Sequence, residues 1–256
     1  MRVVACAGTE RGWARPEDAG GPGIVFVRRG TFARRADGVE SMLDAAVAYF
    51  ELPGTEEQFA HPAGHDDECF SVDLPAALLG DLGRAPSELP LGPVYTTAAI
   101  DLAHRRLALE AGRGCDGFEL YERAAGLVAR ALEGPFPRRP SGGPATARAR
   151  RRLVARAREA LRAEPSTGLV PLAREVGSSP HHLSRVFTAE TGQTLSAYRN
   201  RLRAALALAR LEAGERDLSR LAAELGFADH AHMTRVVRAA AGAPPSELRR
   251  VLAPAG

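Results

Sequence analysis

A motif in the C-terminal half of the sequence occurs twice, and this internal repeat restricts the possible folds more than any other feature. Leu172–Gly177 (LAREVG) returns as Leu221–Gly226 (LAAELG), 49 residues later. After the glycine the offset becomes 50 residues, so Arg185 corresponds to Arg235 and the second copy has one additional residue in its turn. Two copies at a fixed offset predict one supersecondary unit built twice.

Each copy has the sequence signals of two helices joined by a tight turn. Gly177 and Gly226 are expected to end the first helices, because glycine adopts the left-handed backbone at little cost. Ser179 is a predicted cap of the second helix, with Pro180 at its first position, and Asp229 is the corresponding cap in the second copy. The apolar residues of the second helices are expected to face inward: Leu183, Val186, Phe187, Met233, Val236 and Val237.

The polar face of such a second helix fits the major groove of DNA and presents side chains to base edges. Residues 195–212 are the predicted helix between the copies, and at 1.5 Å per residue they span about 27 Å. This length suits two successive major-groove segments about 34 Å apart. The polar faces contain seven candidate base-contacting residues: His181, Ser184, Arg185, His230, Ala231, Thr234 and Arg235. For each arginine the alternatives are a phosphate or an acidic neighbour.

The stretch from about residue 150 to residue 252 resembles the AraC-type transcription regulators. The resemblance rests on the doubled motif and on three further segments: Thr191–Arg199, Leu225–Asp229 and Gly242–Arg249. It implies the same seven base-contacting residues in a cytoplasmic DNA-binding regulator that is not an enzyme and needs no cofactor. It also implies an N-terminal cupin-like domain that senses a small-molecule effector, a homodimer formed through that domain, and RNA polymerase as a partner if the protein is an activator.

The charge distribution supports a polyanionic partner for the C-terminal half. Residues 1–137 contain 13 Arg and 21 Asp or Glu, a net charge of −8, whereas residues 138–256 contain 21 Arg and 10 Asp or Glu, a net charge of +11. Such asymmetry is typical of a chain with one nucleic-acid-binding part. The arginine-rich segment 148–162 has two interpretations, a solvated helix face or a source of phosphate contacts.

The pattern along the chain predicts an α+β multidomain protein. Residues 1–75 contain short apolar runs between turn residues, which favours a small β-barrel or sandwich. Residues 96–111 and 116–132 have helical periodicity, and the Pro- and Gly-rich segment that follows is a linker. We therefore predict a cupin-like effector-sensing and dimerisation domain at 1–132 with a helical hairpin at about 95–132, a linker at 133–146, and an all-α double helix-turn-helix domain at 147–256.

The run from His61 to Cys69 leaves a metal interpretation open, because it contains His61, His65, three carboxylates and a thiol. The alternative function is therefore a metal-dependent cupin enzyme fused to a DNA-binding domain, which elemental analysis of the purified protein distinguishes. A third alternative is an N-terminal domain that only dimerises. No metal ligand or catalytic residue is assigned, and the effector-binding residues stay unknown. No apolar run reaches the roughly 20 residues of a membrane-spanning helix, so no membrane partner is expected.

Overall fold

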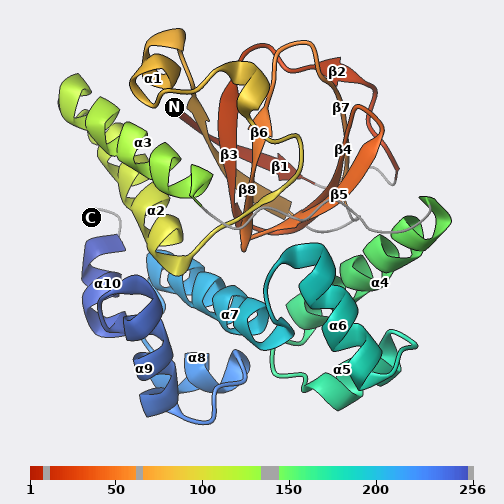
Figure 1. Cartoon of the computed structure of the whole chain (residues 1–256). Coiled ribbons are helices and arrows are strands. Elements are labelled where there is room, and N and C mark those ends of the chain that lie inside the picture. The colour runs from red at the N-terminus through yellow and green to blue at the C-terminus, as the bar shows by residue number, and fades with distance from the viewer. Residues whose placement is uncertain (8–11, 62–65, 134–143, 253–256) are drawn as a thin grey trace. The chain divides into compact units, whose positions relative to one another are not determined.

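The computed structural model describes residues 1–7, 12–61, 66–133 and 144–252. The chain divides between residues 134 and 135 into two compact units, one rich in strands and one helical (Figure 1). This composition confirms the predicted α+β multidomain fold class. Most of the predicted linker, together with His65, lies outside the described residues.

The strands of the N-terminal unit form two antiparallel sheets. The five-stranded sheet has the order β1 (Arg2–Ala7), β8 (Asp66–Asp73), β3 (Gly23–Arg29), β6 (Val47–Glu51) and β9 (Val94–Tyr95). The four-stranded sheet has the order β2 (Glu17–Asp18), β7 (Glu56–Ala60), β4 (Thr31–Ala36) and β5 (Val39–Asp44). In the described parts of the chain no ladder joins these sheets, so the expected barrel is two sheets and not one closed cylinder.

The chain passes from one sheet to the other at Gly30, between β3 and β4. Gly30 has φ +82°, and a Cβ atom at this position would lie 2.5 Å from Cβ of Asp67. Only glycine combines this left-handed backbone with so close an approach of a neighbouring strand. The turn ends the ladder of β3 and starts that of β4, which explains why the strands separate into two sheets.

Aromatic side chains and a buried arginine connect the two sheets. Phe32 of β4 lies 6.3 Å from Tyr49 of β6 and 6.0 Å from Phe59 of β7, measured between ring centroids. Arg34 is only 2% exposed; it pairs with Glu57 and donates a 2.8 Å hydrogen bond to the carbonyl of Phe50. A buried guanidinium is tolerated only with such partners, so this group fixes how β4 lies against β6.

A helical hairpin follows the strands, close to the predicted ranges. After α1 (Ala76–Asp81) and the short 3₁₀ helix η1 (Pro86–Glu88), the hairpin consists of α2 (Ala98–Gly112) and α3 (Gly117–Leu132). Thr97 caps α2 and Asp116 caps α3, each through a side-chain oxygen that accepts backbone N–H bonds. Ile100, Leu107, Leu127 and Val128 of the hairpin are buried in one core with residues of β3, β6 and β8.

A fully buried histidine, His104 of α2, lies in this core between aromatic rings. Its ring stacks on Phe26 with 5.1 Å between centroids, and its Nε2 lies 2.9 Å from Oδ1 of Asp101. Arg105 Nε donates to the same oxygen over 2.7 Å. Burial lowers the pKa of His104 to about 4, and this effect outweighs the raising effect of Asp101.

The buried neutral His104 predicts a pH-dependent stability of the N-terminal unit. Its folded pKa of about 4 lies below the unfolded value of 6.5, so the unfolded chain binds the proton first and stability falls as pH decreases through this window. At pH 5 we expect the free energy of unfolding to be about 2 kcal/mol lower than at pH 7 because of this residue. Urea titrations followed by fluorescence of Trp13, the only Trp in the sequence, measure it.

The matched variant is His104→Gln, which keeps an amide donor for Asp101 but does not titrate. Other groups of the unit, such as Asp67, also have shifted pKa values and contribute equally to both proteins. We therefore expect the free energy of unfolding to fall less steeply from pH 7 to pH 5 in His104→Gln than in the wild type. Equal slopes from pH 7 to pH 5 would contradict the assignment of a buried neutral imidazole.

The C-terminal unit consists of seven helices within residues 144–252. In order they are α4 (Pro144–Ala163), α5 (Leu169–Glu175), α6 (Pro180–Thr191), α7 (Leu195–Glu212), α8 (Leu218–Glu224), α9 (His230–Ala241) and α10 (Pro245–Leu252). The pairs α5–α6 and α8–α9 are the two copies of the sequence repeat, and α7 joins them (Figure 1). No helix in the described segments is long and apolar enough to cross a membrane.

Candidate nucleic-acid interface

The first helix-turn-helix pair is formed by α5 and α6, and the turn between them has the predicted chemistry. Gly177 has φ +67°, and the N–H of Ser178 donates to the carbonyl of Ala173 over 2.8 Å. The Ser179 hydroxyl accepts a hydrogen bond from the N–H of His182 at 3.2 Å, with Pro180 at the first helical position. These local signals place the start of α6 at the predicted residue.

The second pair, α8 and α9, repeats this design with an acidic cap. Gly226 has φ +71°, and the carboxylate of Asp229 accepts a hydrogen bond from the N–H of His232 over 2.6 Å. Both second helices end at a glycine in the left-handed conformation, Gly192 after α6 and Gly242 after α9. We refer to the second helices of the two pairs, α6 and α9, as the recognition helices. Each has 12 residues and begins and ends at equivalent positions of the repeat.

One face of each recognition helix is buried, and the opposite face contains the predicted site residues. Leu183 and Phe187 of α6, and Met233 and Val237 of α9, are fully buried. Val236, predicted to face inward, is only half-buried. The predicted residues His181, Arg185, His230, Ala231 and Arg235 are exposed, and Ser184 and Thr234 are half-buried.

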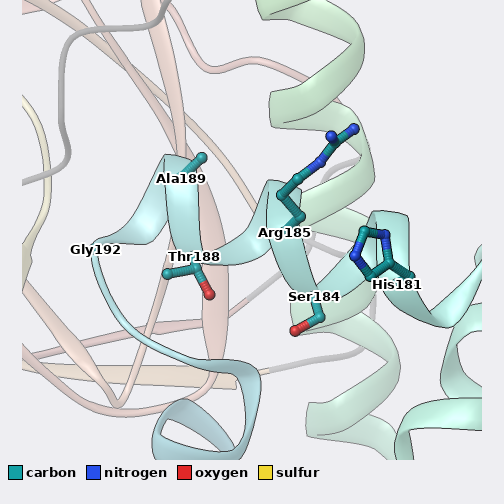
Figure 2. Close-up of a pocket in the computed structure, with 6 residues that line it drawn as sticks. All are labelled: His181, Ser184, Arg185, Thr188, Ala189 and Gly192. Atoms are coloured by element: carbon teal, nitrogen blue, oxygen red, sulfur yellow. The ribbon is translucent and has the colours of Figure 1, made fainter.

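On α6 the predicted residues form a continuous strip along the helix. His181, Ser184 and Arg185 are three and four positions apart, so they lie on the same side of the helix. They line a single hollow with Thr188, Ala189 and Gly192, and Figure 2 shows the Arg185 side chain extending away from the helix axis. Thr188, three positions after Arg185, belongs to this strip and was missing from the predicted set, although helical spacing alone identifies it.

Arg185 and Arg235 form no ion pair with any described residue. Of the alternatives raised by the sequence, an acidic neighbour is therefore not supported. By contrast, Arg210 and Arg220 of the same unit pair with Glu215 at 2.7 and 2.8 Å. An unpaired guanidinium on an exposed helix face is available for a guanine edge or a phosphate.

Both histidines of α9 contact neighbouring groups of the second pair. His230 Nε2 lies 3.4 Å from the Thr234 hydroxyl, so two predicted site residues contact each other. His232 faces the turn, where its Nδ1 accepts from the N–H of Ala228 over 3.2 Å and its ring packs edge-on against Phe227. His232 thus stabilises the turn, and the contact face of α9 consists of His230, Ala231, Thr234 and Arg235.

The arginine-rich helix α4 has two kinds of arginine. Arg148, Arg151 and Arg152 are exposed, which is compatible with both interpretations of this segment. Arg158 is 3% exposed and its Nε donates to the hydroxyl of Tyr198 on α7 over 3.1 Å. This buried arginine connects α4 to α7 and has a structural role.

Within the N-terminal unit, the candidate metal residues have other partners. His61 Nδ1 lies 2.7 Å from Oδ1 of Asp67, and its ring stacks on Phe32 at 5.3 Å between centroids. Cys69 is buried in β8. The described residues contain no group of three potential metal ligands. His61 is thus placed as a packed residue with a carboxylate partner, while His65 lies outside the described residues.

One family model matches a stretch of the helical unit. Residues 172–251 match the family model of a helix-turn-helix domain, a stretch that contains both copies of the repeat. No curated protein matches the sequence.

Several solved structures are similar to the chain at low identity. The C-terminal domain of AraT, a response regulator from Geobacillus stearothermophilus, is 24% identical over 38% of this chain and 84% of that chain, with a TM-score of 0.37. An AraC-type transcriptional regulator from Chromobacterium violaceum is 22% identical over 43% and 99%, with a TM-score of 0.39. ToxT from Vibrio cholerae is 10% identical over 98% and 96%, with a TM-score of 0.38.

The family match and the doubled geometry together define the class of the helical unit. Residues 172–251 form a helix-turn-helix domain that contains both copies of the repeat.

Proposed function

We propose that the chain regulates transcription by placing α6 and α9 in two successive major-groove segments of one operator. The observation that supports this most directly is the pair of exposed arginines, Arg185 and Arg235, at equivalent positions of two capped recognition helices. Neither has a carboxylate partner among the described residues, and arginine is the side chain best suited to a bidentate contact with guanine.

Each predicted residue has a role that follows from its chemistry. In the first unit His181 and Ser184 donate or accept hydrogen bonds beside Arg185. In the second unit Ala231 offers only its methyl group, which suits the methyl of thymine, and Thr234 lies beside His230. We expect α6 to supply most of the discrimination, because its polar residues are not engaged with each other in the described structure.

The N-terminal unit is the proposed sensor and dimerisation domain of a cytoplasmic regulator. It contains a cavity of about 800 Å³, whose lining includes Glu51, Phe59, Leu74 and Leu79, and this is the proposed effector site. We propose that α2 and α3 form a homodimer and that RNA polymerase is the partner if the protein activates. A metabolite that stabilises the full chain in thermal melting supports the sensor role. A complete lack of such stabilisers, with a dimer in sedimentation, favours a domain that only dimerises.

The experiment that tests DNA recognition is selection of binding sites by the full chain from random duplex DNA. The proposal predicts enrichment of one sequence that binds more tightly than random DNA at every salt concentration, with affinities that fall steeply as salt rises. Enrichment of no sequence, with equal affinity for all fragments, would overturn the proposed function.

A further inference from the structure

The additional residue in the second turn of the repeat has a definite structural position. The first turn runs from Gly177 through one residue to the cap Ser179, and the second runs from Gly226 through Phe227 and Ala228 to the cap Asp229. Phe227 is 5% exposed, and its ring lies under the guanidinium of Arg203, with Cζ 5.5 Å from the ring centroid. The longer turn thus places an aromatic ring against the connecting helix α7.

Arg203 also contacts the segment that leads into the first helix-turn-helix pair. It is 5% exposed, and its Nε donates a 2.8 Å hydrogen bond to the carbonyl of Pro165. One helical turn earlier, Nη1 of Arg199 donates to the carbonyl of Thr167 over 3.1 Å. Burial and the charge of Arg199 lower the pKa of Arg203, and together they outweigh the raising effect of the Glu164 carboxylate.

The second turn and this entry segment touch each other directly. A Cβ atom on Gly226 would lie 2.5 Å from Cα of Ser166 and 3.0 Å from Nη2 of Arg203. At the equivalent Gly177 of the first unit, a Cβ atom would meet nothing within 4 Å. The contact therefore exists in only one of the two units, and it joins the second unit to residues 164–168 immediately before α5.

We propose that Arg203 and Phe227 are positioning residues that fix α9 relative to α6, so that the chain accepts a single spacing between its two DNA half-sites. The inference rests on the proposed function, because spacing has meaning only if both helices contact one operator. Arg203 is held at once by a carbonyl of the entry segment before α5 and by a ring of the second turn, which restricts rotation of one helix-turn-helix pair relative to the other. If α6 and α9 are fixed relative to each other, DNA with a different half-site spacing has to twist or stretch to contact both helices, which costs free energy.

The test measures affinity for the selected site while the separation of its half-sites is changed by one base pair in either direction. For the wild-type chain we expect a loss of about tenfold or more per step, from the deformation cost. In Arg203→Lys the charge remains but the planar group that stacks on Phe227 is lost. We expect weaker binding at the original spacing and a profile that is flat to within about threefold, because a loosely tethered second unit adapts to each spacing.

Two further variants make the outcome decisive. Phe227→Leu keeps an apolar side chain but removes the ring, so it serves as the test if Arg203→Lys does not fold. Arg210→Ala is the matched control on α7. Arg210 pairs with Glu215 and Glu224 and not with the entry segment, so this variant should keep the steep dependence of affinity on spacing. A variant that melts earlier yet keeps the wild-type spacing profile would overturn the proposal. If the wild-type chain binds its selected site equally well at all spacings, the single-spacing proposal is overturned but the proposed function stands. If the wild-type chain shows no specific DNA binding, both the single-spacing proposal and the proposed function are overturned.

Discussion

Replacing Arg185 by Ala is expected to reduce discrimination between the selected site and a site with one altered guanine by about 5- to 150-fold. The basis is the discrimination of about 1–3 kcal/mol that a bidentate arginine–guanine contact provides, with about 1.4 kcal/mol for each factor of ten. Arg185 is exposed on the contact face of α6 and has no ion pair among the described residues, so its removal leaves no internal partner unsatisfied. Fluorescence anisotropy with matched and mismatched duplexes measures the ratio.

The matched control is Arg152→Ala, on the exposed side of α4 and outside the recognition helices. If Arg152 contacts phosphate, its removal weakens binding to all sequences alike and lowers the salt slope by about one. An Arg185→Ala variant that behaved in this way, with unchanged discrimination, would show that Arg185 contacts the backbone and not a base.

Gly226→Ala is expected to destabilise the C-terminal unit far more than Gly177→Ala. Both glycines have a left-handed backbone, with φ +71° and +67°, so each substitution has a conformational cost of about 1–2 kcal/mol. Only at Gly226 would the new methyl group overlap Ser166 and approach Arg203. We expect an additional cost of about 1–3 kcal/mol from this overpacking, because the neighbour is backbone and cannot rotate away.

Circular dichroism at 222 nm during thermal unfolding measures the difference between the two variants. Fluorescence of Trp13 follows the N-terminal unit in the same samples and should be unchanged, since Trp13 packs against Arg35 of that unit. Equal melting temperatures for Gly226→Ala and Gly177→Ala would contradict the close contact between the second turn and the entry segment.

The helical unit was largely predictable because its determinants are local. Glycine at a helix end, Ser179 or Asp229 at a helix start and apolar residues at helical spacing each act within a few residues. The doubled motif placed all of them twice, and the structure has the caps and turns at the predicted positions. The seven proposed base-contacting residues stay a prediction.

Other features depend on contacts between distant residues, and no sequence pattern revealed them. β1 pairs with β8 through Val3 and Phe70, partners that only the folded chain brings together. In the sequence, the only sign of the contact between Phe227 and Arg203 is the one-residue increase in the offset between the two copies of the repeat. The composition around His61 left a metal site open as an alternative, and the structure places His61 against Asp67 and Phe32. The division into domains with separate roles also stays a prediction.

The arrangement of the selected DNA site tests the central claim, that one chain contacts DNA through two equivalent recognition helices. The account predicts two half-sites whose centres are about 10–10.5 base pairs apart, one helical turn of DNA. Arg185→Ala should weaken the sequence preference in one half-site and Arg235→Ala that in the other. A selected sequence with a single half-site, unaffected by Arg235→Ala, would contradict the account.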